Sequence, residues 1–178
     1  MASENHPPAD DAQTTRHTLV REALEKVGGK GCVVPAGDDL VAVSESLADS
    51  LGVHTVAVVD DQGRLVGVIP MRLLVDELFL DVAPEEFLVG LREIEDVEEF
   101  GRIIRARTAG ELMEAPAYAR MDDTVREAFT RMHERKLEGL PIVDEKLQVA
   151  GYLDRLQLLR LWLKRRRRSE DEPGRARG

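Results

Sequence analysis

Two segments of this chain carry the same pattern of residues in the same order, 84 positions apart and without a gap. Each has a short apolar stretch ending in aspartate, a turn, a second apolar stretch around a glycine, and the apolar start of a helix. The matching stretches are VAVVD at 56–60 with LPIVD at 140–144, and LVGVI at 65–69 with VAGYL at 149–153. Because a repeat at fixed spacing defines the building unit of a fold, the sequence predicts two copies of one unit.

Hydrophobic periodicity and chain breakers predict the order strand, helix, strand, strand, helix in each copy. In the first half, the expected elements are a helix at 19–27, a strand at 32–34, a helix at 40–51, a hairpin of 53–59 with 65–69, and a helix at 70–79. In the second half, they are a short capped helix at 108–113, a strand at 117–120, a helix from 124 capped by Asp123, a hairpin at 139–153, and a last helix from 154. A unit of roughly 50–60 residues buries little core alone, so the two should pack together. The predicted fold class is α+β, with two pseudo-symmetric units that each form a small sheet flanked by helices.

The segment between the copies is longer than a plain linker and rich in carboxylates. Its apolar residues recur at helical spacing, which predicts a helical insert docked on the pair. The expected organisation is a disordered tail at 1–16, a first unit with an N-terminal helix at 17–80, the acidic insert at 81–107, a second unit at 108–163 and a charged tail at 164–178.

Charge and composition argue against several classes of protein. The net charge of -9 and an aromatic content of 4% do not favour general nucleic-acid binding. The basic run at 164–168 is either an anion-binding patch or a solvated helix end, and the acids that follow favour the second. A single cysteine, Cys32, fits a reducing cytoplasm, and no apolar run is long enough to span a membrane.

Motifs for enzyme chemistry are missing from the sequence. We find no His-x-x-x-His or Cys-x-x-Cys spacing, no G-x-S-x-G nucleophile elbow and no phosphate-binding P-loop. The glycine-rich run at 28–31 precedes a strand, whereas a phosphate cradle follows a strand and opens a helix. The chain is therefore predicted to be noncatalytic and to require no cofactor.

The second copy carries a more specific pattern. Thr124 to Ala128 (TVREA), Met132, GLPIVD at 139–144 and GYL at 151–153 together resemble a CBS domain. The resemblance covers roughly 31–79 and 108–163 and is looser in the first copy, where Ala57 stands in place of the usual proline. The chain thus resembles a tandem CBS pair, or Bateman module. That resemblance implies a regulatory module that binds adenine nucleotides in the cleft between its units, dimerises, and controls an enzyme, channel or transporter.

The ligand signature of the family is Thr or Ser after the third strand and Asp three residues later. The first copy has Pro70 and Leu73 there, which offer neither a donor nor an acceptor for ribose. The second has Asp154 and Gln157, whose spacing fits a helix capping box or an altered ligand contact.

If AMP, ADP or ATP binds, the resemblance places it in the second copy. The expected contacts there are Gly139, Leu140, Pro141, Asp154, Arg155 and Gln157. Asp154 would repel a phosphate at close range unless Arg155 or a cation intervenes. Nucleotide binding is therefore expected to be weak.

The acidic insert suggests an alternative function. Carboxylates such as Glu95, Glu98 and Glu99 are ligands that Mg²⁺ accepts, and some CBS pairs accompany magnesium transporters. The chain would then be a cation-responsive accessory subunit of a membrane transporter. A solvated acidic face explains the same residues, because no Asp-x-Asp-x-Asp loop spacing is present.

Apolar helix faces predict self-association. The last helix has too many apolar residues for a helix with one solvent-exposed face. The apolar faces around Leu47 and Leu51 also need to be buried by more than their own sheet. Phe129, Met132 and Trp162 are the expected contacts of a symmetric homodimer, with Trp162 as its anchor.

Overall fold

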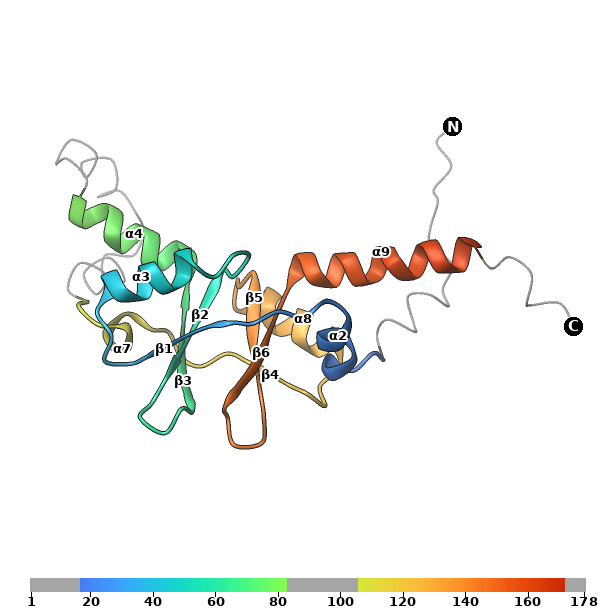
Figure 1. Cartoon of the computed structure of the whole chain (residues 1–178), viewed down its shortest axis with the longest axis horizontal. Coiled ribbons are helices and arrows are strands. Elements are labelled where there is room, and N and C mark those ends of the chain that lie inside the picture. Colours follow the sequence, from blue (N-terminus) through green and yellow to red (C-terminus); the bar gives the residue numbers. More distant parts are fainter. Residues whose placement is uncertain (1–16, 83–105, 172–178) are drawn as a thin grey trace, which may run out of the picture.

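A computed structural model describes residues 17–82 and 106–171 as two small three-stranded sheets side by side (Figure 1). In each sheet the central strand pairs with one parallel and one antiparallel neighbour. The first sheet consists of β1 (Cys32–Pro35), β2 (Thr55–Val59) and β3 (Leu65–Pro70), and the second of β4 (Ala119–Arg120), β5 (Gly139–Val143) and β6 (Val149–Asp154). The α+β class and the two-unit architecture are confirmed.

Helices flank both sheets. They are α2 (Val20–Val27), α3 (Leu40–Ala48), α4 (Met71–Val82), α7 (Ala109–Leu112), α8 (Val125–Glu134) and α9 (Arg155–Asp171). One predicted boundary is wrong, because helix α3 ends at Ala48, three residues before Leu51. Helix α9 continues through the basic run to Asp171, which agrees with the interpretation of that run as a helix end.

The repeat extends to individual hydrogen bonds in the hairpin turns. The Asp60 carboxylate accepts the backbone N–H of Gln62 and of Arg64, both at 2.9 Å. The equivalent Asp144 accepts the N–H groups two and four residues further on, at 2.8 and 2.9 Å. Each hairpin also has a register shift at the same point, before its last central-strand residue. The leading aspartate therefore sets the same turn in both copies.

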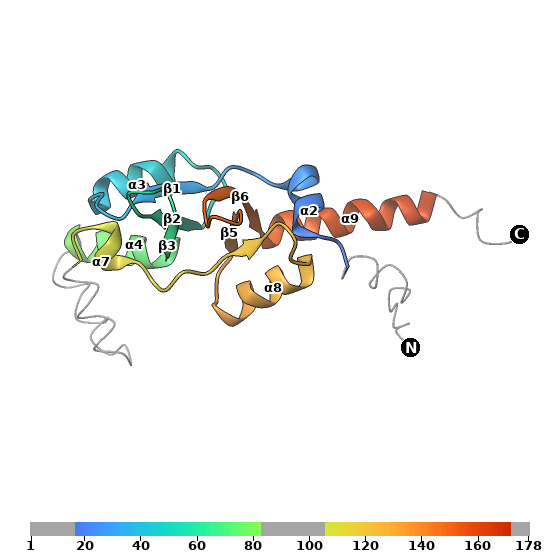
Figure 2. The ribbon, with the colours of Figure 1, turned by 90° about the horizontal axis from the view of Figure 1, so that it is seen from below.

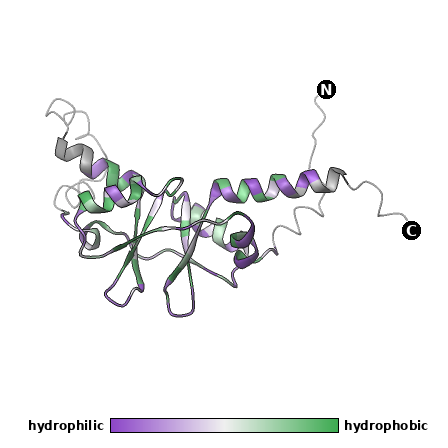
Figure 3. Ribbon diagram, in the orientation of Figure 1, coloured by the Kyte–Doolittle hydropathy of each residue, from purple (hydrophilic) through white to green (hydrophobic). Residues whose placement is uncertain are grey.

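The two hairpins meet directly. The N–H of Leu65 donates to the carbonyl of Leu147 at 2.9 Å, and a bridge joins Arg64 with Gln148. Strands β2 and β5 also contact one another. As Figure 3 shows, the strands at this joint are largely hydrophobic. The predicted packing of the units as a pseudo-symmetric pair is thus confirmed.

The segment before each unit packs on the opposite unit. Helix α2 contacts α9, β6 and α8, and its Val20 and Ala23 are fully buried in the core of the second unit (Figure 2). Helix α7 contacts β1 and β3, and its Ala109 and Leu112 are buried in the core of the first unit. The apolar faces of both helices are therefore covered by the unit across the pair.

The start of α8 differs from the expected cap. Thr124 is the N-cap, and its side chain and that of Glu127 form a reciprocal capping box. Asp123 instead pairs with Arg131 and accepts the N–H of Arg120 at 2.8 Å. Partial burial would raise the pKa of Asp123, but the hydrogen bonds from Arg131 and from the Arg120 N–H, together with the positive charges of both arginines, outweigh it and lower that pKa.

Candidate functional site: the cleft between the units

Each candidate half-site lies where a third strand passes into a helix. In the second half-site, β6 runs into α9, and Gly29 lies alongside with two backbone hydrogen bonds to Tyr152, at 3.3 and 3.0 Å. In the first half-site, β3 runs into α4, and Glu114 makes the equivalent two bonds to Val68, at 3.2 and 2.8 Å. The segment that crosses from the opposite unit thus borders both half-sites.

Asp154 and Gln157 form a closed capping box at the start of α9. The Asp154 carboxylate accepts the N–H of Gln157 at 2.6 Å, and the Gln157 carbonyl oxygen accepts the N–H of Asp154 at 2.9 Å. The Gln157 amide nitrogen points to the crossing segment, because a Cβ at Gly29 would lie 3.4 Å from it. The side-chain groups left for a ligand are this amide N–H₂ and the second carboxylate oxygen.

Tyr152 fills the space between the two units, a role that the sequence reasoning missed. Its side chain is 1% exposed and packs in the core of the first unit. Its hydroxyl accepts the N–H of His54 at 3.1 Å, and a Cβ at Gly139 would overlap that hydroxyl. Burial raises the pKa of Tyr152, and the His54 N–H opposes this only in part. Gly139 therefore makes room for the tyrosine.

The neighbouring residues of β5 face opposite ways. The Leu140 side chain is fully buried among the core residues of the second unit, so it is not exposed toward a ligand. Pro141 is buried and stands opposite Tyr152 in the antiparallel pair. Alternation along the strand explains the difference, since successive side chains point to opposite faces.

Arg155 lies against α8. Its guanidinium donates to the carbonyl of Met132 at 3.2 Å, lies 5.9 Å from the ring centre of Phe129, and is 3.9 Å from the Glu138 carboxylate. These contacts direct the guanidinium toward α8 and Glu138, while its buried Nε has no hydrogen-bond partner among the described residues.

The first half-site is apolar where a ribose would need partners. Pro70 is buried and Leu73 is fully buried in the core of the first unit. Met113 packs so closely on Gly67 that a Cβ there would overlap its sulfur. The charged pair at the rim, Arg72 with Glu114 at 3.3 Å, is satisfied internally.

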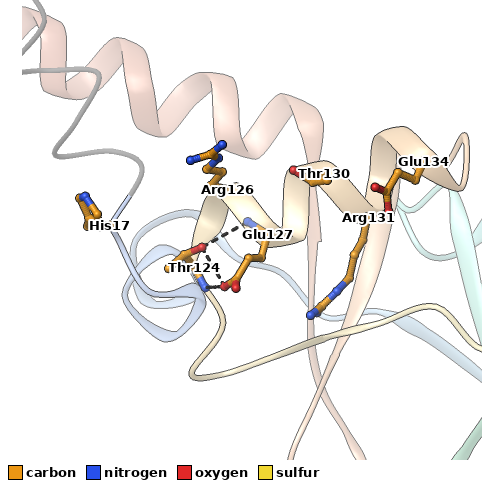
Figure 4. Close-up of a pocket in the computed structure, with 7 residues that line it drawn as sticks. All are labelled: His17, Thr124, Arg126, Glu127, Thr130, Arg131 and Glu134. Atoms are coloured by element: carbon orange, nitrogen blue, oxygen red, sulfur yellow. Dashed lines mark hydrogen bonds between the residues drawn. The ribbon is translucent and has the colours of Figure 1, made fainter.

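An open depression on α8 is lined by polar side chains, three of which have partners within the chain (Figure 4). Thr124 and Glu127 cap the helix, and Arg131 pairs with Asp123. The N–H of Thr124 lowers the pKa of Glu127. The remaining lining residues are His17, Arg126, Thr130 and Glu134.

The predicted metal residues Glu95, Glu98 and Glu99 lie outside the described residues. Within residues 17–82 and 106–171, no group of three His, Cys, Asp or Glu side chains is placed to hold a metal ion. No helix in this part of the chain is long and apolar enough to cross a membrane.

The predicted dimer contacts have different environments. Phe129 is 47% exposed, whereas Met132 is fully buried in the core of its own unit. Met132 is therefore wrong as an interface residue, because α8 turns it toward the sheet. Trp162 is half-buried, with the Arg166 guanidinium 5.7 Å from its ring centre.

Comparison with protein-family models decides the family. The model of the CBS domain matches residues 15–79 and 109–164. The chain belongs to the CBS-domain family. Its two units are a CBS pair, and the resemblance read from the second copy is confirmed.

Solved structures of CBS proteins share the fold. A CBS domain-containing protein from Thermotoga maritima is 25% identical with a TM-score of 0.66, over 90% of this chain and 99% of that one. The CBS domain of a membrane protein from Sphaerobacter thermophilus is 25% identical with a TM-score of 0.58, over 85% and 92%. CBSX2 from Arabidopsis thaliana is 23% identical with a TM-score of 0.60, over 84% and 97%, and CBSX2 has also been solved in complex with AMP. A search of curated proteins gives no match.

Proposed function

We propose that this chain is a noncatalytic regulatory module of the cytoplasm that binds an adenine nucleoside or nucleotide weakly and thereby controls a partner protein. The observation that carries the proposal is the second half-site, where Asp154 and Gln157 stand at the helix start used for ligands in the family. The AMP complex of CBSX2 supports an adenine ligand in a fold of this kind.

The polar groups of that half-site favour a neutral nucleoside over a phosphate. The Gln157 amide can donate to a ribose hydroxyl, and the free oxygen of Asp154 can accept from one. The same carboxylate repels a phosphate at short range, and Arg155 is engaged with α8. Adenosine is therefore expected to bind more tightly than AMP, ADP or ATP.

Calorimetric titration with adenosine, AMP, ADP, ATP and Mg²⁺ tests the proposal. In the variant Asp154→Thr with Gln157→Asp, which restores the family pair, AMP should bind roughly tenfold or more tightly, because a repelling carboxylate becomes a hydroxyl donor. Pro70→Thr is the matched control in the apolar first half-site, where no gain is expected. No heat with any nucleoside, together with no gain in the double variant, would contradict adenine binding.

We also propose that the module acts as a homodimer anchored by Trp162. The support is the set of large apolar side chains left exposed on α4, α8 and α9, which are Met71, Val75, Phe129, Leu156, Leu159 and Leu163. Trp162→Ala should shift sedimentation toward the monomer by weakening the dimer at least tenfold. A wild-type protein that is already monomeric at tens of micromolar would contradict the dimer.

A further inference from the structure

Tyr152 and the polar start of α9 share one face of the second sheet. Tyr152 and Asp154 point to the same side of β6, because alternate residues of a strand do so. Pro141 and Gly139 stand directly opposite them on β5. The other side of β6 carries Leu153, which is fully buried in the core of the second unit. A ligand held by Asp154 would therefore lie on the face that carries Tyr152.

The Tyr152 ring occupies this face. A Cβ at Gly139 would overlap both its hydroxyl and its ring. A Cβ at Gly31, just before β1, would lie 3.4 Å from the Cβ of Tyr152. The ring therefore covers the residue opposite Asp154, so the space beside this carboxylate is filled by an aromatic group of the chain itself.

The polar groups near the Tyr152 hydroxyl are incompletely paired. The hydroxyl accepts the N–H of His54 at 3.1 Å. Thr55, which is 1% exposed, and His54 each keep a buried polar atom, Oγ1 and Nδ1, without a hydrogen-bond partner among the described residues. Unpaired polar atoms in a protein interior are unfavourable, so this region suits a group with more donors and acceptors than a phenol. The edge of adenine has both, at its amino group and its ring nitrogens.

The internal repeat shows that the strand does not require a tyrosine here. The equivalent of Tyr152 in the first copy is Val68, 84 residues earlier, which makes the same two backbone bonds to the segment beside it. Thr55 and Gly139 are equivalent in the same way and begin the central strands β2 and β5, which lie side by side (Figure 1). The Tyr152 hydroxyl lies against Gly139 and accepts the N–H just before Thr55, so the ring spans the point where the two half-sites meet.

We infer that Tyr152 is an internal plug of the second half-site, with its ring where the base of a nucleoside would lie, and that binding requires the ring to move out. With the ribose at Asp154 and Gln157, a base extended along β6 reaches Tyr152, about 7 Å away at a rise of about 3.3 Å per residue. The inference rests on the adenine binding of the proposed function and names the residue that weakens it. The apparent affinity is the intrinsic affinity multiplied by the fraction of molecules whose plug is open. Because the ring packs in the core of the first unit, its movement also links ligand binding to the joint between the units.

Calorimetric titration of the full chain with adenosine tests the plug. Tyr152→Val, which copies the first unit, should bind adenosine at least tenfold more tightly than wild type, because no ring has to leave the site. Val68→Ala removes core volume at the equivalent position and should leave the affinity unchanged. Unchanged or weaker binding in Tyr152→Val, with adenosine still bound by wild type, would overturn the plug and leave the proposed function standing. No adenosine binding in either protein would overturn both.

Fluorine NMR gives a second readout that needs no substitution at the plug. The chain has two tyrosines, so labelling with 3-fluorotyrosine gives two resonances, which the variant Tyr118→Phe assigns. Saturating adenosine should move the Tyr152 resonance to the position of a solvent-exposed tyrosine and leave that of Tyr118 in place. A Tyr152 resonance that stays at its buried position while adenosine is bound would overturn the plug.

Discussion

The two CBS units share their turns and their hairpin register but not the side chains at the candidate half-sites. In the first unit, Pro70 and Leu73 make an apolar helix start, and Val68 projects from the third strand. In the second, Asp154 and Gln157 make a polar one, and Tyr152 replaces the valine. The backbone of the hairpins thus repeats, whereas the side chains at the starts of α4 and α9 differ.

Backbone conformation differs between the units in a similar way. The first unit places glycine at both of its left-handed positions, Gly52 and Gly63, with φ of 79° and 75°. The second unit places Lys136 and Leu147 there, with φ of 53° and 63°. The left-handed conformation is roughly 1 kcal/mol less favourable for a residue with a Cβ than for glycine, so the second unit carries backbone strain that the first unit avoids.

The contrast between Tyr152 and Val68 predicts the largest difference in stability. Tyr152→Ala should reduce the free energy of unfolding by about 3–5 kcal/mol, because a large side chain that joins the two cores is lost. Val68→Ala should cost about 2 kcal/mol, since less apolar volume is removed. Urea denaturation followed by circular dichroism measures both.

Tyr152→Phe serves as the control for the ring. It keeps the packing and loses only the hydroxyl that accepts the His54 N–H, so a loss of about 1 kcal/mol is expected. Equal losses for Tyr152→Ala and Val68→Ala would show that the tyrosine does not join the units.

Much of the fold could be predicted from the sequence, because local signals define its elements. The aspartate turns, the capping box at Thr108 and the apolar strands all depend on residues close together in the chain. The exchange of α2 and α7 between units could not be predicted this way. Their apolar faces show that cover is needed, but not which unit supplies it.

The candidate site was less predictable, because part of it depends on contacts between residues far apart in the chain. The spacing of Asp154 and Gln157 indicated a capping box, and the structure confirms it. The position of Tyr152 depends on contacts with His54 and Gly139, which come from distant parts of the chain. The fixed spacing of 84 residues could have drawn attention to Tyr152, since it aligns this large side chain with the smaller Val68 of the first copy.

Exchanging residues at the left-handed helix end should shift stability in opposite directions in the two units. Lys136→Gly should raise the free energy of unfolding by about 1 kcal/mol, because Lys136 is exposed and glycine relieves the strain without loss of packing. Gly52→Lys should lower it by about the same amount. Thermal denaturation of both variants is the measurement, with Lys136→Ala, which keeps the Cβ, as the control. If Lys136→Ala stabilises as much as Lys136→Gly, the effect comes from the lost charge and not from the backbone.

The smallest expected effect lies in the hairpin turns, where Arg64 of the first unit corresponds to Gln148 of the second. The backbone N–H of Arg64, together with its guanidinium, lowers the pKa of Asp60. Because the folded pKa lies below the unfolded value of about 4, the contribution is present above that pH and is lost as the pH falls through the folded value. Arg64→Gln, which makes the first turn like the second, should raise the pKa of Asp60 and slightly lower stability at pH 7, with no difference once the carboxyl is protonated. Carboxyl titration by NMR and urea denaturation at pH 7 and in acid measure the two effects. A stability difference that persists in acid would mean that Arg64 acts through packing and not through its charge.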